Sequence, residues 1–547
     1  MSVGSYLTFQ VQNNRRNPCM VKFPLPVITI SVLCGISLML FVFDVWGRLS
    51  GSRFGITMSR HRKGLKIFFF FVLLINLLLT FLVFLFCRTE LYNALPIALG
   101  RTADVLVGEN QFFARQSYFV DFLSSCATIS AAFAALVIGL RAMLEKITPL
   151  NSIKACCILL VIASVEGVYY SNSLYSIFFF IVMSQFASLG LYRHAAMRSG
   201  RVIHLLLHHL SRIVAMLLLA AGIILLSARY SPSVVRLIST TIKAGVYEKI
   251  AFSLIFAPLL AFFLRPVSHT ADPVYRAFFA MRSQAVFFVI LRIVFSMFGV
   301  CAALEKVPNI MIFTGCITLL LSVLMMITTK EPEKCGAYTD LFAKGFLVAV
   351  AGIGYYGCFS AEGVAQYGFT ALECLIALWL LYLPLSAALS TAVALFERED
   401  ENGVKLYRKS GLMSLIPVAV LTLFFALFCF CGMPPFATYP FMQLIYRSAT
   451  FVMPALATFL VIAVIAMFFI GLYVIASMAF GKAWTTEDKE KSRIRDSEIA
   501  LPAIILMLWI AFFSFFPGLL IQRIAAPSVE AMLNTGYSIN VIEGAEK

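Results

Sequence analysis

The stretch FCGMPPFATY (residues 430–439) interrupts one of the most apolar parts of this chain. Its prolines, Pro434 and Pro435, lie near the end of an apolar run over residues 412–436, and a second apolar run follows over residues 447–479. A helix that spans a membrane needs about 20 predominantly apolar residues, and both runs are long enough. Because proline has no backbone donor and clashes with the preceding helical turn, the first helix is predicted to break at these two residues.

Comparable apolar runs recur along the whole chain. Of its 547 residues, 61% are hydrophobic and only 13% are charged, whereas soluble domains contain about 25% charged residues. The composition therefore predicts an all-α polytopic membrane protein with about fourteen transmembrane helices. The predicted spans cover residues 24–46, 65–88, 119–143, 150–170, 172–194, 203–228, 246–265, 275–303, 308–329, 341–357, 366–396, 412–436, 447–479 and 499–521.

A second proline occupies a corresponding position earlier in the chain. Pro258 lies in the middle of the seventh predicted span, and Pro434 and Pro435 lie in the twelfth. Broken helices at matching positions are typical of inverted repeats that surround an ion pathway, here helices 4–8 and helices 9–13. The alternative interpretation is that each proline simply kinks its helix for packing.

This interpretation divides the chain into six parts. They are an N-terminal extension (1–23), helices 1–3 (24–143), a first repeat (150–303), a second repeat (308–479), a C-terminal helix (499–521) and a C-terminal tail (522–547). The extension contains Arg15, Arg16 and Lys22 but no acidic residue, a composition typical of organelle import. A short basic tail before the first span is the alternative.

The basic residues predict the orientation of the chain. The formal net charge is +16, but the lysines and arginines gather in short loops, which argues against nucleic-acid binding. Arg48, Arg53 and Lys63 mark one such loop, and the loop over residues 228–249 departs from the trend. The positive-inside rule then predicts that the 48–63 loop faces the inner side of the membrane and that both termini face the outer side, which in a mitochondrial inner membrane would be the matrix and the intermembrane side.

The 430–439 stretch and the long apolar helix after it resemble the AGIPPxxGF segment of the antiporter-like subunits of respiratory complex I (NADH:ubiquinone oxidoreductase). Other resemblances follow in the same order as in that family, at residues 184–188 of helix 5, 273–292 of helix 8 and 334–346 of helix 10. The helix 5 stretch and an early Leu-Pro pair favour chain 2, with chains 4 and 5 as close alternatives. A subunit of an independent multisubunit cation/proton antiporter is the other alternative.

The resemblance implies a membrane-arm subunit of the mitochondrial inner membrane that contributes to assembly and to proton translocation. Its partners would be other membrane-arm and accessory subunits and lipids such as cardiolipin. NADH, FMN, the iron–sulfur clusters and ubiquinone would bind to other subunits. The sequence itself contains no nucleotide-binding or redox motif, so we expect no cofactor, metal or catalytic residue in this chain.

In the family, proton transfer uses a glutamate on helix 5 and lysines on helices 7, 8 and 12, the last sometimes a glutamate. The resemblance places these positions at Val182, Ser253, Ser283 and Met442. None of these side chains can hold a proton charge at neutral pH. The family channel is therefore predicted to be lost or rerouted in this chain.

Four other residues are candidates for a rerouted path. Lys344, Glu373, Arg282 and His208 fall within apolar runs, where charged or titratable groups are costly and are usually functional. The alternative is that some of these side chains only extend toward a headgroup region. We expect a midplane that is dry except where Lys344, Glu373 and Arg282 bridge it.

Overall fold

The computed structural model confirms an all-α chain, because helices make up nearly all of the described residues. The described ranges are 25–49, 62–88, 120–144, 150–199, 202–230, 245–266, 273–299, 306–329, 332–359, 364–396, 411–481 and 497–533, together with Pro232, Val234, Leu237 and Ile242. The predicted N-terminal extension (1–23) lies outside these residues.

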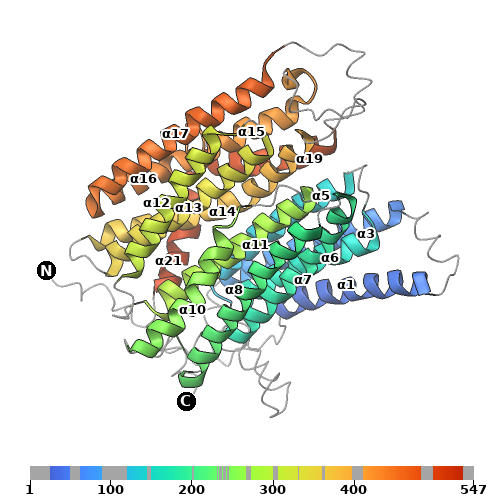
Figure 1. Ribbon diagram of the computed structural model, residues 1–547, viewed down its shortest axis with the longest axis horizontal. Helices are drawn as coiled ribbons and strands as arrows, with labels where there is room; N and C mark the ends of the chain where they lie inside the picture. The colour runs from blue at the N-terminus through green and yellow to red at the C-terminus, as the bar shows by residue number, and fades with distance from the viewer. Residues whose placement is uncertain are drawn as a thin grey trace.

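Helices follow one another along the chain in a single bundle (Figure 1). The first half contains α1 (Leu25–Leu49), α3 (Arg62–Arg88), α5 (Phe122–Leu144), α6 (Ser152–Tyr170), α7 (Leu174–Ser199), α8 (Val202–Arg229), α10 (Val246–Phe263), α11 (Pro273–Leu291) and the π-helical turn η3 (Arg292–Met297). The second half contains α12 (Val307–Ile327), α13 (Pro332–Phe359), α14 (Ala365–Phe396), η6 (Leu412–Ser414), α15 (Pro417–Phe430), α16 (Thr438–Val452), α17 (Pro454–Ala479), α19 (Ser497–Phe515), α20 (Pro517–Leu520), η7 (Ile521–Ala525) and α21 (Ala526–Leu533).

The helices have the length and composition of membrane spans. Within the described residues, ten helices are long and apolar enough to cross a membrane, and a bent pair near the C-terminus makes eleven. Three shorter apolar helices lie in α1, α7 and α15. A multi-pass membrane protein is therefore confirmed, and a helix lies at each of the predicted spans. The total of fourteen transmembrane helices stays a prediction.

The break predicted in the twelfth span is confirmed. Helix α15 ends at Phe430, α16 begins at Thr438, and Pro434 and Pro435 lie between them, joined by a cis peptide bond. The predicted end of this span at residue 436 was wrong, because α16 continues to Val452 and forms the second half of the broken span. The start of the next helix, predicted at residue 447, was therefore also wrong. A new helix, α17, begins at Pro454, which has no donor for the preceding turn.

A glycine in the left-handed region ends α15. Gly432 has φ +60°, its N–H donates to the carbonyl of Cys429 (3.2 Å), and the N–H of Met433 donates to the carbonyl of Phe428 (2.9 Å). These two hydrogen bonds define a Schellman motif, which satisfies the last carbonyls of a helix. The stretch that breaks the span thus also keeps its backbone hydrogen-bonded, as the interior of a membrane requires.

We expect Gly432→Ala to destabilise the fold. A left-handed backbone costs a non-glycine residue about 1–2 kcal/mol. The added Cβ would also approach Met442 Sδ to 2.4 Å, which adds an overpacking cost of about 1–3 kcal/mol. The measurement is thermal unfolding of the detergent-solubilised protein. Gly64→Ala is the matched control, because Gly64 lies in α3 with open space around it, so its melting temperature should not fall.

The break predicted at Pro258 was wrong. Helix α10 is continuous from Val246 to Phe263, with Pro258 buried inside it. The proline removes only the donor that would bond to the carbonyl of Leu254, and helices in membranes tolerate one such loss where neighbouring helices pack around it. Within the described residues, only the second repeat therefore contains the expected broken helix.

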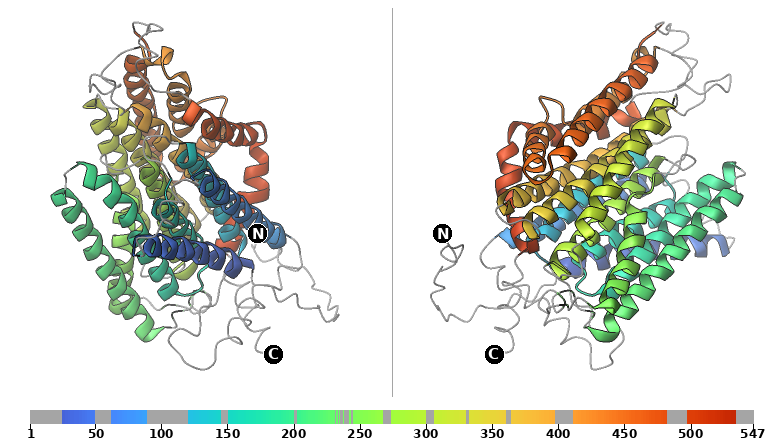
Figure 2. Two further views of the ribbon diagram at one scale, coloured as in Figure 1. Left: turned by 90° about the vertical axis from the view of Figure 1, so that its right-hand side faces the viewer. Right: turned by 60° about the vertical axis from the view of Figure 1, so that its left-hand side comes forward.

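The C-terminal boundary also differs from the prediction. The helix predicted over residues 499–521 ends at Phe515, and a second helical segment beginning at Pro517 bends away from it by 90°. Residues up to Leu533, which were assigned to a tail, continue this segment as η7 and α21. Helix α21 packs against α5, α14 and η3, so it lies across the end of the bundle (Figure 2).

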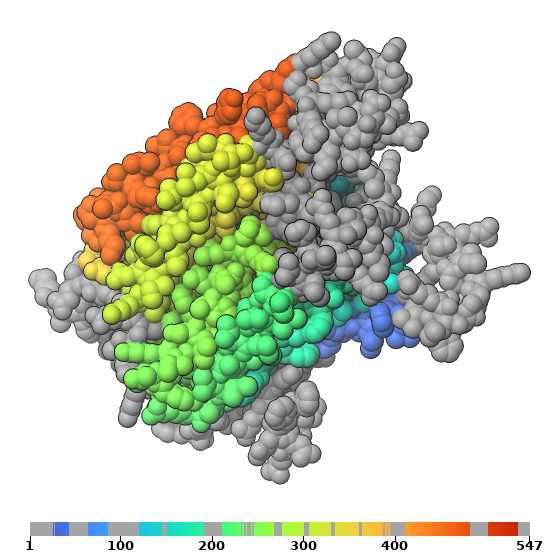
Figure 3. Space-filling view, viewed as in Figure 1, coloured from blue at the N-terminus to red at the C-terminus, as the bar shows by residue number. Residues whose placement is uncertain are grey.

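The centre of the bundle is formed by α11 and α14, which pack against each other and join the two predicted repeats. Every residue of the most apolar window of α11 is buried. By contrast, α8, α12 and α17 expose large apolar side chains on the outside of the bundle, and these helices cover one face in Figure 3. An apolar outer face is expected where the solvent is lipid or a neighbouring membrane subunit.

Candidate functional site

Three buried cations surround one aromatic ring in the middle of the bundle. The ring belongs to Phe279 on α11. The guanidinium carbons of Arg282 and Arg212 lie 5.0 Å and 5.4 Å from its centroid, and Lys344 Nζ lies 5.7 Å from it. All three distances fit cation–π attraction. We call Phe279, Arg212, Arg282, Lys344 and Asp340 the midplane cluster.

The three cations lie at similar depths. At 1.5 Å per residue, Lys344 is about 18 Å from the start of α13, Arg282 about 14 Å from the start of α11, and Arg212 about 15 Å from the start of α8. In the predicted topology these three helices cross the membrane in the same direction. With a hydrocarbon core about 30 Å thick, that topology predicts that the cluster lies close to the membrane centre.

Lys344 forms an ion pair within its own helix. Its Nζ lies 2.6 Å from Oδ2 of Asp340, one helical turn earlier on α13. The exposed fractions of the two side chains are 0% and 6%. A buried charge is stable only when paired or otherwise compensated, so each member of this pair depends on the other.

The two arginines contact neutral acceptors on α7. Arg282 donates hydrogen bonds to the hydroxyl of Ser188 and to the carbonyl of Ser184, the latter at 3.4 Å. Arg212 donates to the side-chain carbonyl of Gln185 at 3.3 Å. The stretch of helix 5 that carries part of the family resemblance therefore provides the polar lining of the midplane cluster.

The structure brings some of the predicted path residues together and separates others. Lys344 and Arg282 share the ring of Phe279. Glu373 is half-buried on α14 and close enough to Glu530 of α21 for their charges to interact. Within the described part of the chain, it forms no hydrogen bond or ion pair with the cluster. The side chain of His208 lies outside the described part of the chain.

Sequence reasoning missed Asp340, Arg212 and Phe279. Asp340 could have been found from its spacing, because it lies four residues before Lys344 and therefore on the same face of a helix. Arg212 could have been found as a cation within the apolar run of helix 6. Nothing in the sequence distinguishes Phe279 from the other 51 phenylalanines.

The side chains at the four substituted channel positions are bound locally or are apolar. The hydroxyls of Ser253 and Ser283 donate to carbonyls of their own helices, at Lys249 (2.8 Å) and Ala280 (2.7 Å). Ser253 is exposed on the outside of α10, whereas Ser283 is buried. Val182 is half-buried, and Met442 is buried against Tyr446, whose hydroxyl lies 3.5 Å from its Sδ.

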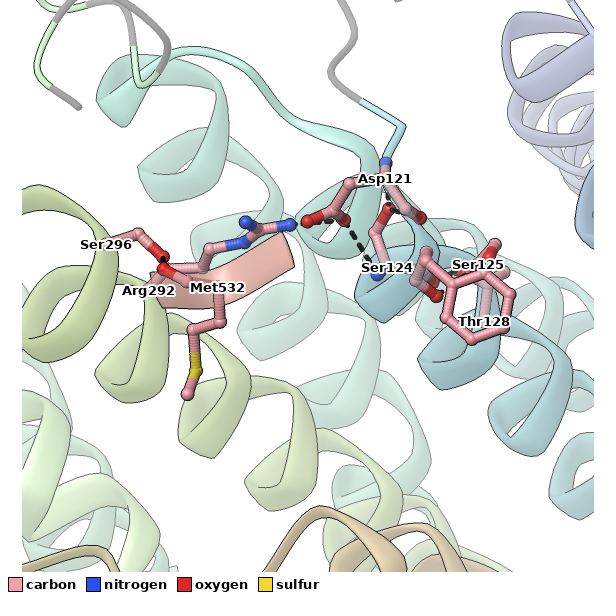
Figure 4. A network of polar contacts seen from close by, with 8 residues as sticks. Asp121, Ser124, Ser125, Thr128, Arg292, Ser296 and Met532 are labelled. Atoms are coloured by element: carbon pink, nitrogen blue, oxygen red, sulfur yellow. Dashed lines mark hydrogen bonds and ion pairs between the residues drawn. The ribbon is translucent and has the colours of Figure 1, made fainter. Parts of the chain in front are cut away.

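A second polar network links three elements at one end of the bundle (Figure 4). The carboxylate of Asp121 forms an ion pair with Arg292 of η3 and accepts a hydrogen bond from the N–H of Ser124 (2.9 Å). In return, the N–H of Asp121 donates to Ser124 Oγ (2.9 Å), so Asp121 also caps the start of α5. Ser296 Oγ donates to the carbonyl of Met532 (3.0 Å) and connects η3 to α21.

Two further buried carboxylates lie outside both groups. Glu166 on α6 accepts a hydrogen bond from Asn76 of α3 (2.6 Å). Glu248, at the start of α10, pairs with Arg229 at the end of α8 (2.8 Å). Each contact joins neighbouring helices, so polar groups contribute to the specific packing of this bundle.

The fold and the midplane cluster define a class: polytopic helical membrane proteins with a broken span and an ion pair buried among the helices. No protein-family model and no curated protein matches the chain. Its fold is nevertheless similar to that of chains in solved multisubunit membrane complexes.

Three such structures cover almost the whole chain. A chain of the Mrp complex from Dietzia sp. has a TM-score of 0.71 and 16% identity, covering 94% of this chain and 99% of that one. A chain of respiratory complex I from Thermus thermophilus with bound NADH has a TM-score of 0.69 and 14% identity, covering 93% and 99%. A chain of the membrane-bound sulfane sulfur reductase, an archaeal respiratory membrane complex, has a TM-score of 0.66 and 13% identity, covering 95% and 100%. At these identities, the likeness shows the fold.

Proposed function

We propose that this chain is a membrane-arm subunit of mitochondrial complex I, most like chain 2, in the inner membrane. Its partners in this proposal are other membrane-arm and accessory subunits and lipids such as cardiolipin, and the redox cofactors belong to other subunits. We further propose that proton transfer through the chain is rerouted to the midplane cluster. The buried ion pair of Lys344 and Asp340 carries this part of the proposal.

The chemistry of the cluster assigns different roles to its cations. An arginine does not release its proton in a protein, so Arg212 and Arg282 act as fixed positive charges. Lys344 is the cation of the cluster that can exchange a proton. The carboxylate of Asp340, whose Oδ2 lies 2.6 Å from Nζ, is the acceptor within reach of that proton.

This mechanism replaces the family's arrangement with one inside a single helix. In the family, the lysine and the glutamate that tunes it come from different helices. Here both partners lie on α13, one turn apart, and the repelling charges come from α8 and α11. Proton transfer within this pair therefore needs no movement of one helix against another.

The test is the number of protons translocated per NADH oxidised by the assembled complex. We expect the double variant Lys344→Met with Asp340→Asn to lower this ratio, because the exchanging group is removed and neither member of the ion pair is left buried without its partner. Lys306→Met is the matched control, since Lys306 is exposed at the start of α12, and it should leave the ratio unchanged. An unchanged ratio in an intact double variant would instead support a purely structural subunit.

A second candidate function is a subunit of a multisubunit cation/proton antiporter. The similarity to a chain of the Mrp complex favours it. Co-purification separates the two candidates: a complex I subunit should travel in a megadalton assembly that oxidises NADH. Sodium-dependent proton movement in vesicles that contain no electron donor would favour the antiporter.

A further inference from the structure

An apolar cavity lies between helices from both ends of the chain. Its volume is about 670 Å³, within the range of sites that hold small organic ligands. Its walls come from α3, α5, α14, α19, α20 and η7. Phe133 of α5 and Trp509 of α19 stack against each other in the wall, with their ring centroids 4.3 Å apart.

The cavity opens on the outside of the bundle. Leu78, Phe81 and Phe512 line it, and these residues are also 54%, 44% and 48% exposed. All three belong to helices with the composition of membrane spans. The opening therefore lies in an apolar surface, where the surrounding molecules are lipids or other membrane subunits.

Almost no polar group is available inside the cavity. The hydroxyl of Ser130 is already used, because it donates to the carbonyl of Leu380 (2.9 Å). Of the described residues that line the cavity, Arg523 is the one that carries a charge. It lies on η7, beyond the 90° bend that follows α19, and it is exposed. An apolar chamber with a single cation at its edge matches the chemistry of a lipid with a negatively charged headgroup.

The predicted topology gives this cation a suitable depth. The cavity is lined by the second half of α3, the first half of α5 and the second half of α19. In the predicted topology all three stretches belong to the half of the membrane nearer the intermembrane side. Arg523 follows the end of α19 and so lies near the headgroup level of that same leaflet.

We propose that this cavity holds an acyl chain of an anionic phospholipid whose phosphate is bound by Arg523. The guanidinium offers two parallel N–H donors, which suit a phosphate better than a single point charge does. The acyl chain fills the space between α3 and α19. The bound lipid thereby links the N-terminal helices to the C-terminal helix, whatever route protons take.

A photoactivatable phosphatidylglycerol with a diazirine near the end of one acyl chain tests the proposal. The assembled, detergent-solubilised complex is labelled with this probe, and mass spectrometry locates the cross-links. We expect labels in residues 77–84, 126–133 and 509–513. Arg523→Gln should weaken labelling about tenfold, because a hydrogen bond to a charged group is lost.

Two comparisons separate this lipid from other occupants. Ile129→Trp fills the cavity and should also remove labelling, whereas Arg447→Gln changes an exposed arginine of α16 away from the cavity and should have no effect. Equal labelling by the matching phosphatidylcholine, or labelling that survives Arg523→Gln, would overturn the assignment of an anionic lipid. Labelling that survives Ile129→Trp, or cross-links that join this surface to a neighbouring subunit, would overturn the cavity as a lipid site.

Discussion

Replacing Arg292 by leucine is expected to destabilise the folded chain by about 3–5 kcal/mol, because the substitution leaves a buried carboxylate without its cation. The side chain of Asp121 is only 11% exposed, and that of Arg292 is 4% exposed. Asp121 would remain bound to the N–H of Ser124 at the start of α5, so its charge could not turn toward water without uncapping the helix. The free energy of unfolding, measured by denaturation of the solubilised complex, checks this value.

A double variant distinguishes the lost ion pair from a lost packing contact. Asp121→Asn removes the charge but keeps a good helix cap, and alone it should be destabilising because Arg292 is then left buried without its carboxylate. Asp121→Asn combined with Arg292→Leu should be more stable than either single variant. If the two single effects simply add, the ion pair is not the cause of the destabilisation.

The second large effect is expected at Asp340. Asp340→Asn should destabilise the fold more than Lys344→Met, because the two substitutions leave different charges around Phe279. Without Asp340, three cations remain near the ring. Without Lys344, two cations and one carboxylate remain, so opposite charges still balance in part. The expected loss for Asp340→Asn is about 3–5 kcal/mol, as for other uncompensated buried charges.

Adding Lys344→Met to Asp340→Asn should recover part of this loss, since one of the three cations is removed with the carboxylate. Thermal unfolding of the intact assembly ranks the stabilities of Asp340→Asn, Lys344→Met and the double variant. A Lys344→Met protein that is less stable than Asp340→Asn would contradict the charge balance inferred for the cluster. Glu373→Gln serves as a control, because the half-buried Glu373 lies near Glu530 of α21 and, among the described residues, forms no hydrogen bond or ion pair with the cluster.

Much of the fold follows from the sequence. Apolar runs of spanning length predict the helices, and the Gly-x-Pro-Pro stretch predicts the broken span, since both signals are local. Pro258 shows the limit of this reasoning. Whether a proline breaks a helix depends on the neighbours that pack around it, and α10 remains continuous because the surrounding bundle supports it. The bend after Phe515 likewise depends on tertiary contacts, because it allows α21 to pack against α5 and α14.

The site was only partly predictable. Depth in an apolar run identified Lys344 and Arg282, because a charge there is costly wherever its partners lie. The sequence could not show that Arg212 shares the same ring, since that contact joins helices about 70 residues apart in the chain. Glu373 also lies deep in an apolar run, but its side chain lies near Glu530 of α21. The sequence does not show which neighbouring helix each face of α14 will contact, so it could not separate Glu373 from Lys344.

The contact between Ser296 and Met532 has a consequence for the order in which the chain is made. These residues are 236 positions apart. Helix α5 and the turn η3 are therefore synthesised long before α21. The end of the bundle formed by Asp121, Arg292 and Ser296 therefore stays incomplete throughout translation. It closes only when the last described helix has left the ribosome and the translocation machinery, so a truncated chain that stops before Met532 would leave the first half of the protein open at that end.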